Sequence, residues 1–246
     1  MNVDSIKTFD THKMKPNSTE PQIITERFAN FIASLAAINE GWNDQQIDQL
    51  LMRMSSEFEQ CLKRMYRVVR KKKEKFTFII NNCNTIITAF EKQNWMQNPS
   101  RELERFSLIL NRTIQKYVDE VLRPFFGPMI TFVIETEPLL SRKEEIELDK
   151  EMIEHIIEGF SSVWKDALEF IKDDVIKSFT RPKTGTEILH SALTALLYYY
   201  QRFLDIMNKK PFNEISLKNE LINRHHVMME VKKHRIEKHG ESENVA

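Results

Sequence analysis

Apolar residues recur every three or four positions along most of the chain, which is the spacing of one face of an α-helix. The first stripe follows a capping residue at Ser18 or Thr19 and predicts a helix of about five turns. Gly41 is expected to end this helix, and Asn43 to cap the next one. The apolar positions of the first stripe are Ile24, Phe28, Phe31, Leu35 and Ile38.

A second stripe extends over residues 43–94 without a single Gly or Pro. We therefore expect one very long helix, bent near the lysine-rich stretch at 70–75. With a rise of 1.5 Å per residue, such a helix would be about 75 Å long, which is more than a compact globule of this size needs. A rod-like arrangement is therefore expected.

Prolines organise the middle of the chain. Pro99 and Ser100 open a third helix, which Pro124 is expected to end. The next stretch, FFGPMITFVIE at 125–135, has the composition of a strand, but a single strand would have no partner in this chain. We therefore predict a short buried helix there.

Three further helices are expected toward the C-terminus. One covers about 144–179, and Thr184 with Glu187 three residues later forms a capping-box start for the next, over 184–207. The last helix begins at Ser216.

About seven helices with short connections predict an all-α fold, an elongated stack of antiparallel bundles. Residues 1–18 show no sustained period and are expected to be a flexible lead-in, and 236–246 a disordered tail. The rod would cover 19–235, with sub-bundles expected at 19–122 and 123–235.

Composition narrows the classes of function. The 36 basic and 36 acidic residues cancel, so no overall field favours nucleic acid, and no nucleic-acid partner is expected. Five glycines cannot supply a phosphate loop or a dinucleotide fingerprint, and no nucleophile elbow occurs. We expect that the protein is not an enzyme and that it binds neither a cofactor nor a small-molecule substrate.

The two cysteines and the N-terminus bear on the compartment. Cys61 and Cys83 lie within one predicted helix, too far apart to bridge, and indicate buried thiols in a reducing cytosol. The first ten residues lack an apolar core, and no stretch reaches the roughly 18 apolar residues of a membrane span. The sequence predicts a protein that is neither secreted nor membrane-spanning.

A histidine pair marks the last helix. His225 and His226 are adjacent, so their side chains point about 100° apart, which is poor geometry for a metal even with His234 nearby. We expect this helix to contact a partner protein through His225, His226, Met229 and Lys232. An isolated adaptor with a metal-binding or peripheral membrane role is the alternative.

Arg70, Lys71, Lys72 and Lys73 form a basic run. Contact with an anionic membrane surface is one interpretation. The favoured one is a solvated helix face, because stable attachment normally needs more than a few charges and Glu74 dilutes the run.

Two other polar clusters have structural explanations. The acidic residues of 144–151 lack the pattern of a calcium loop and suit the start of a helix, where they complement its dipole. They are Glu144, Glu145, Glu147, Asp149 and Glu151. Asn81, Asn82 and Asn84 are unusual inside a helix, and we expect a neighbouring segment in the bundle to satisfy them.

A helical enzyme with paired carboxylates is a further hypothesis. It would need inward-facing acids such as two Glu-x-x-His motifs. The nearest match is the stretch Met152–His155, preceded by Glu151, and it departs from that spacing.

Five stretches, taken together, carry a family resemblance. They are PQIITERFANFIASLAAIN at 21–39, KEKFTFIINNCNTII at 73–87, PFFGPMITFV at 124–133, GFSSVWKDALEFIKDDVIKSFTRPKTGTEIL at 159–189 and ELINRHHVMMEVKKH at 220–234. In this order they resemble the C-terminal half of the vacuolar protein sorting-associated protein 52 family, subunits of the Golgi-associated retrograde protein (GARP) complex and its endosomal counterpart. The resemblance covers about residues 3–235.

That resemblance implies a non-catalytic tethering subunit built from a helical rod. Its partners would be sister tethering subunits, SNAREs and Rab or Arf-like small GTPases, in transport from endosomes to the trans-Golgi network and in endosomal recycling. Its location would be the cytosolic face of the trans-Golgi network and endosomes, as a peripheral membrane protein. Family members also carry a long N-terminal coiled-coil region for assembly, so a fragment, a truncated product and a divergent short form remain open.

Overall fold

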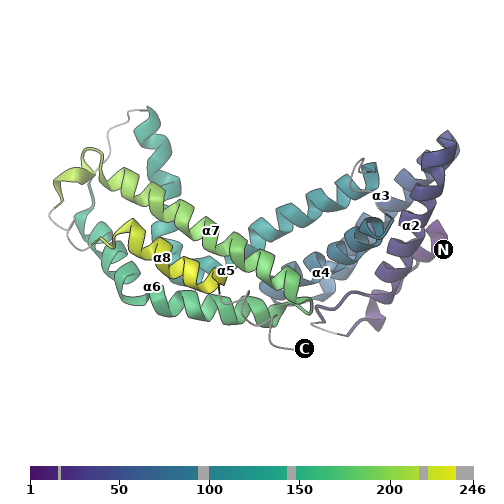
Figure 1. The fold of residues 1–246 in the computed structure, drawn as a ribbon, viewed down its shortest axis with the longest axis horizontal. Coiled ribbons are helices and arrows are strands. Elements are labelled where there is room, and N and C mark those ends of the chain that lie inside the picture. Colours follow the sequence, from purple (N-terminus) through teal and green to yellow (C-terminus); the bar gives the residue numbers. More distant parts are fainter. Residues whose placement is uncertain (16–17, 94–99, 143–147, 216–220, 237–246) are drawn as a thin grey trace. The chain divides into compact units, whose positions relative to one another are not determined.

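The computed structural model describes residues 1–15, 18–93, 100–142, 148–215 and 221–236, shown in Figure 1. The described residues contain eight α-helices, two short 3-10 helices and no strand, so the predicted all-α fold class is confirmed. The chain divides into two compact units, Met1–Tyr117 and Val118–Ala246.

The core of the first unit forms among α2 (Ile23–Trp42), α3 (Gln45–Val68) and α4 (Lys72–Glu91), with α2 packed against both of the others. The ring of Phe28 on α2 stacks on Phe58 of α3, with centroids 4.0 Å apart. The predicted stripes therefore meet face to face.

The prediction of a single long helix over 43–94 is wrong. The backbone is extended at Val69 (ψ 131°) and Lys71 (ψ 138°), so α3 ends and α4 begins around Arg70. Val69 is almost fully buried, at 1% exposure. The interruption allows both stripes to pack against α2, and this apolar burial outweighs the local preference for continued helix.

The boundary between α2 and α3 also differs in detail. Gly41 lies inside α2, which ends at Trp42, and Asn43 terminates it in the left-handed conformation (φ 54°). Asp44 caps α3, with its side chain accepting a hydrogen bond from the amide of Gln46. Asn tolerates the left-handed region better than most residues, so it stops a helix here instead of starting one.

Residues 1–18, expected to be a flexible lead-in, instead contain α1 (Val3–Lys7) and a 3-10 turn, Thr11–Lys13. The side chain of Ile6 is fully buried against the core of the first unit. Arg64 of α3 donates hydrogen bonds to the carbonyl groups of Ile6 (2.8 Å) and Lys7 (3.2 Å). One apolar anchor and one capping arginine hold the segment, and neither produces a periodic pattern.

The helix expected to end at Pro124 continues. α5 (Arg101–Arg142) contains Pro124, Pro128 and Pro138, although each internal proline removes a hydrogen bond and costs about 3 kcal/mol. Apolar residues around the prolines are buried at helical spacing, which offsets that cost. They are Leu122, Phe126, Met129, Ile130 and Val133. The predicted buried helix over 125–135 is confirmed, as a part of α5.

The second unit packs α6 (Lys150–Ser178), α7 (Pro182–Met207) and α8 (Arg224–Ile236) side by side, as Figure 1 shows. Phe160 of α6 stacks on Tyr200 of α7 with ring centroids 4.5 Å apart. The 3-10 turn Phe212–Glu214 follows α7, and the ring of Phe212 contacts Phe132 of α5 edge to face.

Two predicted helix starts shift. α7 begins at Pro182, so Thr184 lies buried within the first turn and is not the residue that caps the helix. α8 begins at Arg224, and residues 216–220, where the last helix was expected to start, lie outside the described part. The tail from 237 onward also lies outside it.

Candidate interaction surface

The last helix, α8, separates its apolar and polar side chains between two faces. Val227 and Val231 are buried, and His234 is nearly so. Asn223 directly precedes the helix, and its side-chain oxygen accepts a hydrogen bond from the amide of His225 at 2.8 Å. All four candidate partner-binding residues are exposed, namely His225, His226, Met229 and Lys232.

A pocket of about 400 Å³ lies between α8 and α6 and includes two of these four residues, His226 and Met229. Its other lining residues come from α6, from the segment before α8 and from the next turns of α8. They are Trp164, Lys165, Ile222, Glu230 and Lys233. His225 and Lys232 are exposed on α8 outside that lining.

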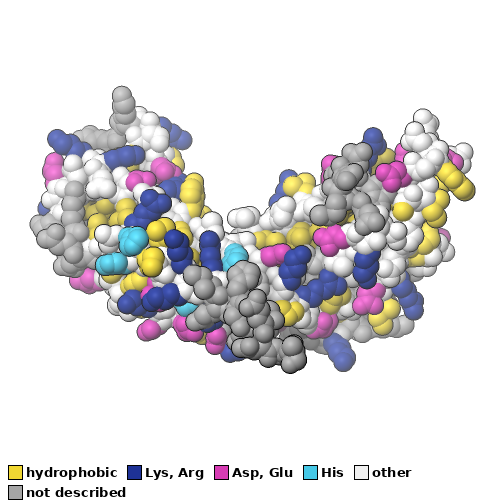
Figure 2. Space-filling model, viewed as in Figure 1, with side chains coloured by type: hydrophobic (Ala, Val, Ile, Leu, Met, Phe, Trp, Pro, Cys, Tyr) yellow, Lys and Arg dark blue, Asp and Glu magenta, His cyan; other side chains and the backbone are white. Residues whose placement is uncertain are grey.

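Cations dominate this helix. Its described residues include four basic side chains but only one acidic side chain, that of Glu230. The basic ones are Arg224, Lys232, Lys233 and Arg235. The hydrogen bond from Lys233 to Glu230 (2.8 Å) holds the pKa of this carboxyl below its ordinary value. Figure 2 shows Lys and Arg side chains gathered over α8, with histidines beside them.

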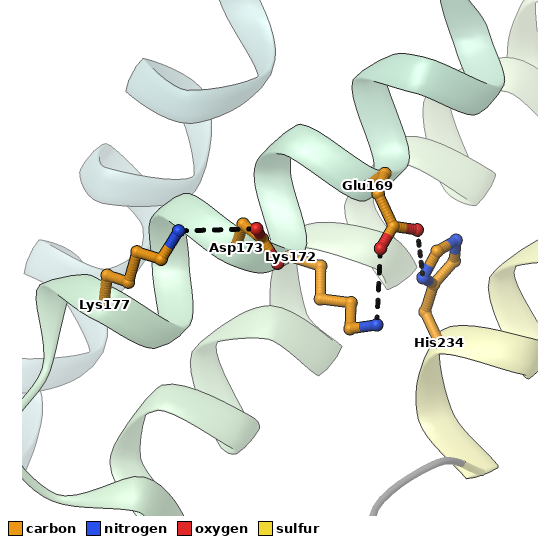
Figure 3. Close-up of polar contacts among 5 residues, drawn as sticks. All are labelled: Glu169, Lys172, Asp173, Lys177 and His234. Carbon is orange, nitrogen blue, oxygen red and sulfur yellow. Dashed lines mark hydrogen bonds and ion pairs between the residues drawn. The ribbon is translucent and has the colours of Figure 1, made fainter.

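The three histidines do not converge. His234 faces α6, where its Nδ1 lies 3.8 Å from the carboxylate of Glu169, whereas His225 and His226 are exposed. Glu169 also pairs with Lys172 at 3.6 Å, so this carboxylate links two cationic or protonatable groups (Figure 3). In the described residues, no three His, Cys, Asp or Glu side chains are grouped to hold a metal ion.

The basic run lies in the first unit, where α3 gives way to α4. Arg70 precedes Lys71, the residue before α4, and Lys71 pairs with Glu74 at 3.2 Å. The run therefore occupies a connection and the first turn of α4, not the continuous helix face expected. Arg70, Lys71 and Lys72 are exposed, and Lys73 is half-buried.

The remaining candidate clusters have local structural roles. Asp149 caps α6, accepting a hydrogen bond from the amide of Met152 at 2.9 Å, and Glu151 lies in the first turn. Glu144, Glu145 and Glu147 lie outside the described residues. Glu151, Glu154 and His155 are exposed, so they do not form the inward-facing acid site that a diiron bundle needs.

The expectation for the asparagines holds for two of them. The side-chain amide of Asn81 donates to the carbonyl of Thr19 at 2.9 Å, and Asn82 bonds with the first turn of α2. Asn84 is half-buried. Cys61 and Cys83 are both free and buried, on α3 and α4.

The sequence did not predict that α6 would contribute residues to this pocket. Trp164 and Lys165 lie 65 and 64 positions before Met229, and only the packing of α6 on α8 brings them together. Trp164 follows the apolar period of α6, so its pattern indicates a core residue and no more.

No helix in the described part of the chain has an apolar stretch long enough to cross a membrane.

Comparison with known proteins identifies the family. Residues 1–118 match the family described as "Vps52, C-terminal". The human vacuolar protein sorting-associated protein 52 homolog is 33% identical over 237 residues, which is 96% of this chain and 32% of the human protein. The Caenorhabditis elegans homolog is 25% identical over 241 residues, covering 94% of this chain and 34% of that protein.

A plant protein is also similar to this chain. Vacuolar protein sorting-associated protein 52 A of Arabidopsis thaliana is 26% identical over 235 residues, or 94% of this chain and 32% of the plant protein. The chain thus spans about a third of the length of these relatives. On the strength of a match that extends over nearly all of its residues, this chain belongs to the vacuolar protein sorting-associated protein 52 family.

Proposed function

We propose that this chain is a non-catalytic scaffold segment of a multisubunit vesicle tethering complex, of the GARP type, in retrograde transport from endosomes to the trans-Golgi network and in endosomal recycling. The name of its relatives, vacuolar protein sorting, supports the broader role in sorting. Its partners are sister subunits, SNAREs and Rab or Arf-like small GTPases, and it works at the cytosolic face of trans-Golgi and endosomal membranes.

The exposed face of α8 is the observation that supports a protein-binding role. This helix buries Val227 and Val231 in its own unit and still leaves Met229 46% exposed beside a pocket. A large apolar side chain at the rim of a concavity is typical of a contact that a partner completes.

The test is affinity purification of the tagged chain from cells, followed by native mass measurement of what copurifies. We expect sister tethering subunits with the unchanged chain, and their reduced recovery when His225, His226, Met229 and Lys232 are all changed to Ala. A matched control changes Glu151, Met152, Glu154 and His155, which are exposed on α6, to Ala and should leave recovery unchanged. Recovery of no tethering subunit, SNARE or GTPase with the unchanged chain would refute the proposal.

Contact of residues Arg70–Lys73 with a membrane is tested by a separate experiment. Salt-sensitive binding of the chain to anionic liposomes, lost when these four residues are changed to Glu, would support the peripheral membrane alternative.

A further inference from the structure

We propose that the pocket between α6 and α8 binds a short acidic peptide segment that inserts one apolar side chain. This inference rests on the proposed function, because it names the chemistry of a partner that uses the α8 face. It is carried by the composition of the pocket and by the charges around it.

The wall of the pocket is apolar. Trp164 of α6 is 6% exposed, Ile222 is half-buried, and Met229 is 46% exposed. A volume of about 400 Å³ exceeds what a single buried water would occupy and accommodates a leucine or phenylalanine side chain. The indole of Trp164 and the flexible side chain of Met229 suit an inserted apolar anchor.

The rim of the pocket is cationic. Lys165 lies with its ammonium group 5.4 Å from the centre of the Trp164 ring, and Lys233 and His226 flank the opening from α8. The one acid in the lining, Glu230, is already bonded to Lys233. A peptide carboxylate that flanks the anchor would therefore meet more positive than negative charge.

A membrane surface fits this face less well than a peptide. A helix that binds in the plane of a bilayer needs a wide apolar face directed at the lipid. The valines of α8 are buried in the second unit, and among the side chains described for residues 224–235 Met229 is the only large apolar one that is exposed. The other apolar groups lie inside a concavity that a peptide side chain can enter and a flat surface cannot.

Four synthetic peptides of about 15 residues, labelled with a fluorophore, test the proposal by fluorescence anisotropy. The first is acidic with a central leucine, the second acidic with serine in its place, the third neutral with leucine, and the fourth basic with leucine. We expect the first to bind most tightly and to shift the methyl NMR signal of Met229.

Charge reversal provides the variant and its control. Changing Lys165 and Lys233 to Glu should weaken binding of the acidic leucine peptide about tenfold or more. Changing Lys183 and Lys209, which are exposed on α7 and after it, to Glu should have little effect. Circular dichroism melting of each variant reports whether the fold is retained, and Met229→Ser tests the apolar part without changing charge.

Three outcomes would overturn the inference. They are no binding by the acidic leucine peptide, equal binding by the neutral peptide, and binding of phosphatidylserine vesicles that depends on Lys165 and Lys233 while the peptides do not bind. If one of these outcomes is observed while sister subunits still copurify with the unchanged chain, the inference fails and the proposed function stands. If the peptide binds but no tethering partner copurifies, the reverse holds.

Discussion

Asn82 of α4 accepts a hydrogen bond from the hydroxyl of Thr25 on α2, with the two oxygens 2.5 Å apart in the interior of the first unit. The same oxygen of Asn82 accepts from the amide of Gln22 at 3.2 Å, and its nitrogen donates to the carbonyl of Phe78 at 2.7 Å. One fully buried amide thus ties the first turn of α2 to α4.

Asn82→Ala should therefore destabilise the first unit by about 2–3 kcal/mol, because it leaves a buried hydroxyl and a backbone amide without their acceptor. Chemical denaturation, with hydrogen exchange of the α2 and α4 amides, measures the change. Asn30→Ala, at an exposed position on α2, is the control and should cost less than about 1 kcal/mol. Equal losses for the two variants would contradict the role assigned to Asn82.

Glu59 of α3 makes stability depend on pH. Lys63 (2.8 Å) and Arg105 (3.1 Å) hold the pKa of this carboxyl below its ordinary value, although burial opposes them. Because the folded pKa lies below the unfolded one, this stabilisation is present above the unfolded pKa and is lost as the pH falls through the folded one.

Glu59→Gln should lower the free energy of unfolding by about 1 kcal/mol at pH 7, and the difference should shrink as the pH falls below the ordinary glutamate pKa of about 4.3. Urea denaturation across this range is the measurement. The exposed Glu40 gives a control, since Glu40→Gln should change stability by less than about 0.5 kcal/mol. A Glu59 difference that persists at the acid end would show that lost packing, not charge, is the cause.

Tyr200 of α7 donates a hydrogen bond from its hydroxyl to the carbonyl of Ile222, in the segment that leads into α8. Burial of this hydroxyl raises the pKa of Tyr200 above its ordinary value. Tyr200→Phe keeps the ring stacked on Phe160 and removes the bond, so we expect a loss of about 1–2 kcal/mol and faster hydrogen exchange in α8.

The matched control is Tyr198→Phe, two positions earlier on the same helix, where the side chain is 59% exposed. It should leave exchange in α8 unchanged. If both variants behave alike, Ile222 is not held by Tyr200.

Cys83 should resist alkylation in the folded chain. Burial raises the pKa of its thiol to about 12, so at pH 8 only about one molecule in ten thousand carries the reactive thiolate. Cys61 is also buried, and burial raises its pKa as well. Iodoacetamide followed by mass spectrometry should label neither thiol in the native chain and both after unfolding in guanidinium. Rapid native labelling of Cys83 would place it nearer the surface than the structure does.

Helical periodicity predicted most of the elements, because each helix buries one face and its apolar residues recur with the turn. Breaks and continuations were harder to predict. No helix-breaking residue marks the end of α3, yet the backbone is extended at Val69, and Pro124 lies inside α5 although prolines usually end helices. In both places burial of neighbouring apolar residues in the tertiary structure outweighs the local preference of the backbone.

For the candidate site as well, some features could be predicted from the sequence and others only from the tertiary structure. The sequence by itself determined that this is an all-α chain and that Asn81 and Asn82 need partners, and it singled out His225, His226, Met229 and Lys232 on the last helix. Only the tertiary structure decided that α3 and α4 are separate helices, that His234 faces Glu169, and that Trp164 and Lys165 complete a pocket beside Met229. The reason is physical: periodicity records which face of a helix is apolar, whereas a pocket depends on which helix that face meets.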